Sequence, residues 1–133
     1  MSRVDFGLLD TSVIIDLAAL NDATLPLQSA ISAVTLAELE AGVYAAKSEL
    51  ERSARLDRLQ RTEAAFTPIP FDAAAARAYG RIYAAVVAAG RQPRRRFADL
   101  QIAATALAHD LPLFTRNPDD FVGLDSLVTV HPV

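Results

Sequence analysis

The sequence contains no cysteine, and this absence excludes disulfide bonds and thiolate metal ligands. Its two histidines, His109 and His131, do not have the spacing of a metal-binding pair. A metal ion bound by this chain would therefore be held by oxygen ligands.

The chain also lacks a positive net charge and a long apolar run. Its formal charge is -3, so an attraction to nucleic acid would have to come from a local basic patch. No uninterrupted apolar run approaches the roughly 18 residues of a membrane-spanning helix. Asp5 and Asp10 interrupt the segment where a signal peptide would carry its apolar core. We therefore expect a soluble, cytoplasmic protein that does not bind a membrane.

Apolar residues, by contrast, are plentiful. They make up 52% of the sequence, which is enough to build a core and too much for a disordered chain. No linker and no internal repeat interrupts this composition. Residues 1–133 are therefore predicted to form a single domain.

Short apolar runs bounded by turn residues alternate with helical patterns. Strands are expected at residues 6–9, 31–34, 66–71, 112–115 and 128–131. Prolines restrict the third of these to an edge strand or an extended connector. Helices are expected from residue 36 to between 42 and 46, and at 48–61, 73–89 and 97–107. This alternation predicts an α/β sandwich with a mostly parallel central sheet.

Acidic residues stand near the ends of the predicted strands. Asp10 follows the first strand, and Glu38 lies one helical turn beyond the second. Asp99 heads the helix before the fourth strand, and the loop after that strand adds Asn117, Asp119 and Asp120. Ligands of open parallel sheets bind beyond the carboxyl ends of the strands. These separate segments are therefore expected to bring their acids to one rim.

Each acid also has a structural interpretation that needs no ligand. Asp10 can cap the next helix, and Asp99 suits the positive end of its own helix dipole. Thr35 and Glu38 fit a capping box, in which both side chains satisfy backbone N–H groups at a helix start. For each acid taken alone, both interpretations stay open.

Acids gathered at one rim without cations repel each other. A divalent cation removes this repulsion, and oxygen ligands without histidine or cysteine favour Mg²⁺ or Mn²⁺ over zinc. Such an ion can orient a phosphodiester, lower the pKa of a bound water and neutralise charge developing on the phosphate. The combination of acids therefore indicates nuclease chemistry without a protein nucleophile.

One dense basic cluster precedes Asp99 and consists of Arg94, Arg95 and Arg96. Its position would let it bring phosphates toward the acids, and a solvated loop is the alternative. A second set of arginines recurs every third residue at positions 52, 55, 58 and 61, and a stripe that faces phosphates is one interpretation of it. The spacing of Glu51 with Arg55, and of Asp57 with Arg61, favours a solvated face of ion pairs for this second set.

The acids lie in four short motifs, Leu8-Leu9-Asp10-Thr11-Ser12, Leu36-Ala37-Glu38-Leu39, Ala98-Asp99-Leu100-Gln101-Ile102-Ala103 and Thr115-Arg116-Asn117-Pro118-Asp119-Asp120-Phe121. In combination they resemble the acidic motifs of PIN-domain ribonucleases, specifically the VapC-type toxins of bacterial toxin–antitoxin pairs. The likeness extends from the first predicted strand to the last. It implies a PIN-like three-layer α/β sandwich and an endoribonuclease toxin that depends on Mg²⁺ or Mn²⁺.

The resemblance implies that Asp10, Glu38 and Asp99 are the first three acids of the active site. It places the fourth at Asp120, just before Phe121, although Asp119 is its immediate neighbour. The polar residues that support the acids are Thr11, Ser12, Thr115, Asn117 and Asp119. The family also implies a homodimer and a cognate VapB-type antitoxin whose C-terminal segment blocks the site. DNA would be contacted only indirectly, through the antitoxin.

Our mechanistic hypothesis assigns direct metal binding to Asp10 and Asp99. Glu38 and Asp120 would act through coordinated water or a second ion. An activated water would attack the RNA phosphate and leave 5′-phosphate and 3′-hydroxyl ends. The candidates for contacts with the RNA backbone are Arg94, Arg95, Arg96 and Arg116.

Two alternatives remain at this stage. A receiver-like phosphotransfer domain also gathers acids at the end of a parallel sheet, but such domains have a lysine near the end of the last strand. Lys47, inside the helical region, is the only lysine of this chain. The other alternative is a catalytically idle PIN-like module that binds a protein partner, and such a module need not retain all four acids.

Overall fold

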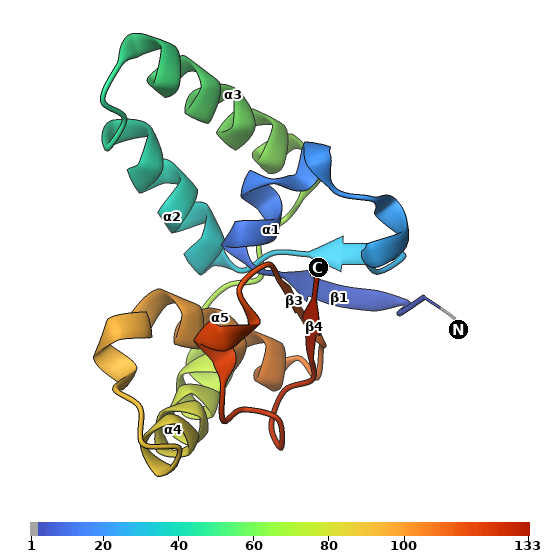
Figure 1. The fold of residues 1–133 in the computed structure, drawn as a ribbon, viewed down its shortest axis with the longest axis vertical. Helices are drawn as coiled ribbons and strands as arrows, with labels where there is room; N and C mark the ends of the chain where they lie inside the picture. Colours follow the sequence, from blue (N-terminus) through green and yellow to red (C-terminus); the bar gives the residue numbers. More distant parts are fainter. Residues whose placement is uncertain (1–2) are drawn as a thin grey trace.

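A four-stranded, fully parallel sheet forms the centre of the computed structural model, which describes residues 3–133 (Figure 1). The strand order is β2-β1-β3-β4. The strands are β1 (Phe6–Leu9), β2 (Gln28–Ala30), β3 (Leu113–Thr115) and β4 (Val130–Pro132). The predicted α/β class with a parallel sheet is confirmed.

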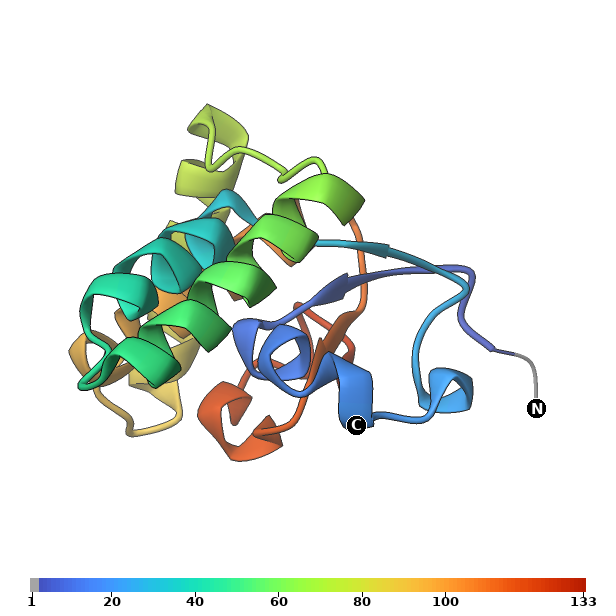
Figure 2. The same ribbon diagram turned by 90° about the horizontal axis from the view of Figure 1, so that it is seen from above.

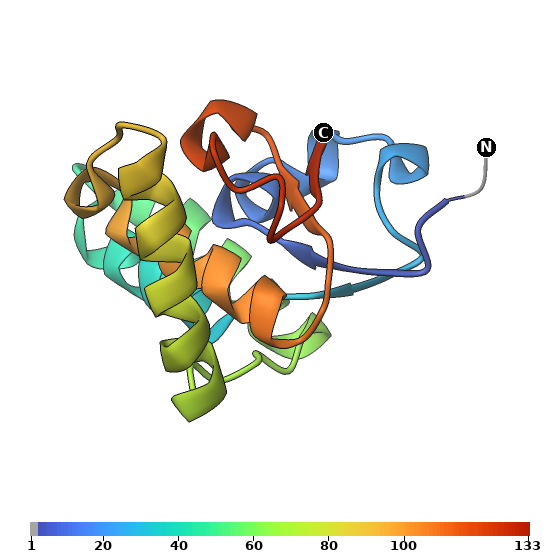
Figure 3. The same ribbon diagram turned by 90° about the horizontal axis from the view of Figure 1, so that it is seen from below.

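Helices cover both faces of this sheet and give three layers. They are α1 (Thr11–Ile15), α2 (Ala33–Tyr44), α3 (Glu49–Ala65), α4 (Ala73–Ala88) and α5 (Phe97–Ala108). Figure 2 shows α2 and α3 side by side as a hairpin, with α1 near them. Figure 3 shows α4 packed along α5 on the opposite side of the molecule. Short 3₁₀ helices, η1 (Leu17–Ala19), η2 (Asp22–Thr24), η3 (Pro93–Arg96) and η4 (Pro118–Phe121), complete the connections.

The alternating side chains of the strands divide the core into two halves. Leu8 and Leu113 pack with buried residues of α4 and α5. Leu9 and Phe114, their neighbours in sequence, pack with buried residues of α1, α2 and α3. Successive side chains of a strand point to opposite faces, so a parallel sheet covered on both sides needs such continuous apolar runs.

Two predictions about the second strand are wrong. The strand is Gln28–Ala30 rather than 31–34, and α2 already begins at Ala33. Ser32 caps this helix, because its side chain accepts a hydrogen bond from the backbone N–H of Val34 at 3.0 Å. The capping box of Thr35 and Glu38 is therefore absent, and both residues lie inside the helix. Pairing with the backbone of β1, rather than apolar content, defines this edge strand.

The proline-containing segment at residues 66–71 takes the extended-connector alternative rather than becoming a fifth strand. It joins the molecule by a single parallel bridge between Ile69 and Ser32. The last strand is Val130–Pro132 instead of 128–131, and Val128 is buried in the preceding turn. The order of strands and helices is otherwise as predicted, except that the short helix α1 follows β1.

The predicted ion pairs on α3 are present. Arg55 pairs with Glu51, and Arg61 pairs with Asp57, each one turn apart. Asp72 caps α4 as predicted, because its side chain accepts a hydrogen bond from the backbone N–H of Ala75 at 3.0 Å. Across residues 3–133, no helix combines the length and the apolar composition needed to span a bilayer.

Gly7 in β1 has no space for a side chain. A Cβ atom built there would lie 2.5 Å from Cε1 of Phe114 and 3.2 Å from Cγ of Pro26. The ring of Phe114 is 3% exposed and stacks on His131, so it has little freedom to move away. We expect Gly7→Ala to lower the free energy of unfolding by about 2 kcal/mol, measured by urea denaturation.

The matched control is Gly80→Ala in α4, where an added Cβ would meet nothing within 4 Å. There the substitution should raise the free energy of unfolding by about 0.5–1 kcal/mol, because alanine is the better helix former. Equal effects of the two substitutions would contradict the close packing of β1 against Phe114.

Candidate active site

Asp10 is the buried acid at the end of β1, and it also caps α1. Its backbone N–H donates to the carbonyl oxygen of Phe114 at 2.9 Å, which fixes the residue at the end of β3. Its Oδ1 accepts from the backbone N–H of Thr11 at 2.8 Å. Its Oδ2 accepts from the hydroxyls of Ser12 at 2.9 Å and Thr115 at 2.8 Å. Both interpretations of Asp10, as a helix cap and as a strand-end acid, therefore hold together.

Asp10 is only 3% exposed, and three donors hold its carboxylate in one orientation. Hydrogen bonds to an ionised carboxylate are stronger than those between neutral groups, and they stabilise its charged form. An ionised carboxylate offers about four acceptor positions, so about one remains free. Within residues 3–133, Asp10 has no ion pair with a basic side chain.

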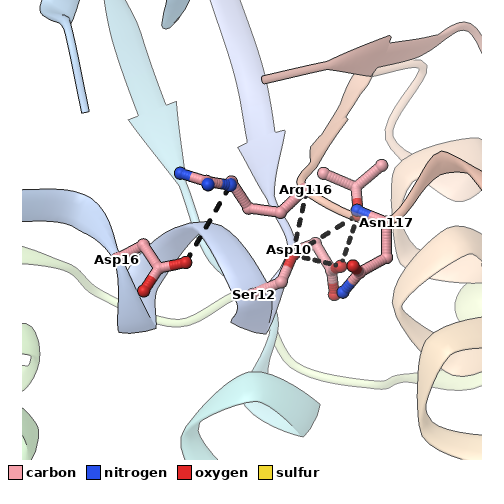
Figure 4. Close-up of polar contacts among 6 residues, drawn as sticks. Asp10, Ser12, Asp16, Arg116 and Asn117 are labelled. Carbon is pink, nitrogen blue, oxygen red and sulfur yellow. Dashed lines mark hydrogen bonds and ion pairs between the residues drawn. The ribbon is translucent and has the colours of Figure 1, made fainter. Parts of the chain in front are cut away.

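The loop after β3 locks the two hydroxyls that serve Asp10. The backbone N–H of Arg116 donates to Oγ of Ser12 at 3.1 Å, and that of Asn117 donates to Oγ1 of Thr115 at 3.0 Å. Each hydroxyl thus accepts from a backbone N–H and donates its own proton to the carboxylate. Figure 4 shows these residues gathered around Asp10.

Glu38 joins the site through α2. The hydroxyl of Thr11 donates to Oε1 of Glu38 at 2.6 Å, and the hydroxyl oxygen of the fully buried Thr35 lies 3.0 Å from that of Thr11. Thr11 therefore contacts Asp10 with its backbone and Glu38 with its side chain. Sequence reasoning assigned Thr35 to a helix cap and missed this contact. Its spacing of three residues from Glu38, which places both on one helix face, is the signal that could have revealed it.

Asp99 lies in the first turn of α5 and is half-buried. Burial raises the pKa of its carboxyl to about 7, and the negative charges of Asp10, Asp120 and Glu38 add to this effect in that order. The Arg96 guanidinium opposes the shift. Acids from four separate segments therefore share one electrostatic environment, as the rule for parallel sheets predicts.

The two neighbouring acids of η4 lie in different surroundings. Oδ1 of Asp120 accepts from Nε of Arg96 at 3.3 Å, and Asp120 acts on Asp99. Asp119 is exposed, and its backbone carbonyl accepts from Nη1 of Arg91 at 2.7 Å. The structure thus brings Asp120, rather than Asp119, toward the other acids.

The four candidate RNA-binding arginines differ in whether they pair with an acid of the chain. Arg94 and Arg95 are exposed on η3, whereas Arg96 pairs with Asp120. Nε of Arg116 lies 3.9 Å from Oδ2 of Asp16, a partner that sequence reasoning did not identify (Figure 4). The exposed pair is therefore better placed to reach a large external ligand than the other two.

The donor set fits a hard divalent cation by its chemistry, because every candidate ligand is a carboxylate. Over residues 3–133, no three histidine or acidic side chains lie close enough to form a metal-binding group by themselves. Mg²⁺ in proteins usually keeps several waters and uses only one or two carboxylates, so a closed cage is not required. Asp10 and Asp99 are two carboxylates whose charges interact.

Comparison with known proteins shows a match along almost the whole chain. The model of the PIN domain family matches residues 7–126. The chain is 40% identical over 128 residues to Ribonuclease VapC5 of Mycobacterium tuberculosis (strain ATCC 25618 / H37Rv), covering 94% of this chain and 92% of that protein.

Solved structures show the same similarity. A crystal structure described as a member of the VapBC family of toxin–antitoxin systems, VapBC-5 from Mycobacterium tuberculosis, matches with a TM-score of 0.82 and 39% identity, over 96% of this chain and 97% of that chain. FitAcB from Neisseria gonorrhoeae matches with a TM-score of 0.69 and 28% identity, over 92% of this chain and 94% of that chain.

The raised pKa of Asp99 makes the stability of the metal-free protein depend on pH. The pKa is about 7 in the folded state, compared with an ordinary value of 3.8, so the folded state binds more protons between these values. The stabilising contribution of the neutral carboxyl is present below about pH 4 and is lost as the pH rises through about 7.

In EDTA, we therefore expect Asp99→Asn to raise the free energy of unfolding at about pH 8 by about 2 kcal/mol, with little effect at about pH 4. Urea denaturation of both proteins across this range measures the difference. Asp125→Asn, which removes an exposed acid from the turn before β4, should show no such pH dependence. If the difference in the free energy of unfolding between wild type and Asp99→Asn did not change with pH, the interpretation would be wrong.

Proposed function

The chain belongs to the PIN domain family, and from this we infer that it is a VapC-type endoribonuclease toxin. The observation that carries the inference is the effect of Asp10, Glu38 and Asp120 on Asp99. Carboxylates from separate segments lie close enough to repel each other, and a site for a cation explains why the fold accepts that cost. The similar protein of Mycobacterium tuberculosis is named a ribonuclease, which is consistent with this chemistry.

The cofactor we propose is Mg²⁺ or Mn²⁺, held directly by Asp10 and Asp99, with Glu38 and Asp120 acting through water or a second ion. When bound, such an ion supplies Lewis acidity, lowers the pKa of a water nucleophile and neutralises charge on the scissile phosphate. Hydrolysis would leave 5′-phosphate and 3′-hydroxyl ends.

The remaining residues of the site position these acids. Ser12 and Thr115 hold Oδ2 of Asp10, and the backbone of the following loop holds both hydroxyls. Thr11 fixes Glu38 relative to Asp10. Because the orientation of Asp10 is set before any ligand arrives, little rearrangement would be needed on binding. Arg94 and Arg95 are the exposed candidates for the RNA backbone.

We further propose that the chain forms a homodimer and is neutralised in the cytoplasm by a cognate VapB-type antitoxin, because similar solved structures come from toxin–antitoxin systems. DNA would be bound only through that antitoxin. The match to the PIN domain family sets aside the receiver-like alternative. The idle binding module is disfavoured by the hydrogen-bond network around Asp10, which orients an acid that contributes a buried charge and no apolar packing.

Removal of the Asp99 charge should lower the activity of the protein without lowering its stability. Asp99→Asn is expected to lower Mg²⁺-dependent cleavage of single-stranded RNA by at least about 100-fold, because it removes a direct ligand of the ion. The same variant should be no less stable than wild type, since it also removes a repelled charge. The rate of cleavage and the chemistry of the product ends measure this, with Asp125→Asn as the control that keeps activity. Wild-type cleavage by Asp99→Asn would refute the assignment.

Binding of the ion should stabilise the folded state by mass action. Mg²⁺ or Mn²⁺ at about 100 times its Kd is expected to add about 2.7 kcal/mol to the free energy of unfolding and to raise Tm accordingly. Asp125→Asn should retain this shift of Tm, whereas Asp99→Asn should lose most of it. A full shift in Asp99→Asn would mean that the ion binds elsewhere.

A further inference from the structure

Arg58 differs from the other arginines that recur along α3. Those three each pair with an acid of the same helix: Arg52 with Glu49, Arg55 with Glu51 and Arg61 with Asp57. Within residues 3–133, the guanidinium of Arg58 has neither an ion pair nor a hydrogen bond, although the residue is half-buried. A cation that loses part of its hydration without gaining a partner destabilises the protein. The interpretation of this face as uniformly ion-paired therefore fails at one position.

The position of Arg58 connects it to the acidic site. It lines a cavity of about 370 Å³ between α1, α2 and α3, which is also lined by Thr11, Glu38 and the ion-paired Arg55. Ile15 and Leu39 supply apolar wall to this cavity. Cavities of this size are within the range of natural ligand pockets. Glu38 thus connects this cavity to the acidic site, and Arg58 lines the same cavity.

An apolar groove continues from this cavity. It has a volume of about 480 Å³ and lies between the segment formed by α1 and η1 and the outer part of α3. Arg58 and Ile15 line both hollows, so they form the boundary between them. Phe66 and Leu17 are among the apolar residues of the groove. Asp57 and Arg61, which pair with each other, also line the groove. Moving away from Glu38, a ligand would therefore meet Arg58 first and a mainly apolar surface next.

Nucleic acid has this order of chemical groups along its chain, because each anionic phosphate is followed by a sugar and a base with apolar faces. The acids of the site repel a polyanion, so the strand needs cations on both sides of the scissile phosphate. The segment η3, which carries the exposed arginines, packs against α4 and α5. Helix α3 stands on the other side of the molecule (Figure 1). Only Arg58 offers an uncommitted guanidinium on the α3 side of the described chain, within the pocket that contains Glu38.

We propose that the cavity among α1, α2 and α3 is a nucleotide subsite, in which Arg58 binds an RNA backbone phosphate adjoining the scissile one. The apolar wall beside Arg58 then faces the attached sugar and base. This inference rests on the proposed ribonuclease function and adds to it the path of the strand across α1 toward α3. It makes Arg58 a substrate-binding residue rather than part of a solvated surface.

The test compares Arg58→Gln with Arg52→Gln, a control on the same helix whose arginine does not line the cavity. Binding of a labelled single-stranded RNA of about 20 nucleotides is measured by fluorescence anisotropy across a range of salt concentrations. Both substitutions are made in the Asp99→Asn background, so that no cleavage occurs during the measurement. Unchanged urea denaturation of each variant shows that the fold is retained.

Arg58→Gln should weaken RNA binding about 5- to 20-fold and reduce the slope of log K against log salt by about 0.7, the value for one contact with a single-strand phosphate. Arg58→Lys should keep the slope, because it keeps the charge, and Arg52→Gln should change neither quantity. In the active protein, Arg58→Gln should raise KM about tenfold and change kcat much less.

Identical salt slopes for Arg58→Gln and Arg52→Gln would overturn the subsite. Loss of antitoxin binding without loss of RNA binding would also overturn it, because the cavity would then belong to a protein partner. If the wild-type protein cleaves RNA in either case, the proposed function stands while the subsite fails. If it binds RNA through Arg58 but does not cleave it, the subsite stands while the proposed function fails.

Discussion

Repulsion between carboxylates at one edge of the sheet is the constraint on which the site depends. The parallel strands bring the ends of β1 and β3 together, and the starts of α2 and α5 lie beside them. This topology half-buries Asp99 beside Asp10, Asp120 and Glu38. Burial raises the pKa of Asp99 to about 7, and the negative charges of the three other acids add to the effect. Burial alone would favour apolar side chains at this edge. Apart from the capping of α1 by Asp10, we therefore relate these acids to the proposed metal chemistry rather than to the stability of the fold.

Neutral hydroxyls, rather than cations, hold the carboxylate of Asp10 in place. Arginine partners would satisfy the same carboxylate, but they would also neutralise the charge that a metal ion needs. Ser12 and Thr115 donate to Asp10 without adding charge, and their own acceptor positions are filled by backbone N–H groups. Asp120 shows the other solution, because Arg96 pairs with it and reduces its repulsion of the remaining acids. Asp10 is thus kept available for a cation, while Asp120 is partly neutralised.

The sequence was sufficient for the fold class and for the convergence of the acids, because both follow from the order of strands and helices. It was not sufficient for β2, where apolar content favoured residues 31–34 and pairing with β1 selected Gln28–Ala30. Edge strands depend on backbone pairing more than on side-chain propensity. Thr35 and Arg58 were also missed, because their neighbours come from α1 and α2, which are separate in sequence. Spacing within a short stretch of sequence predicts helix caps and ion pairs. Contacts between separate helices and strands can be identified only from the structure.

Over residues 3–133, the arginines near the site are, like the acids, divided between paired and unpaired side chains. Three arginines near the site, Arg55, Arg96 and Arg116, pair with acids of the chain, which limits non-specific attraction in a protein whose formal charge is -3. Those left uncommitted, Arg94 and Arg95 on η3 and Arg58 on α3, belong to opposite sides of the molecule. In the arrangement we propose, a polyanion held at both ends would cross the acids between them, and a divalent ion there would offset the repulsion. Affinity would then come from the two arginine sites, and the acids would act on the phosphate between them.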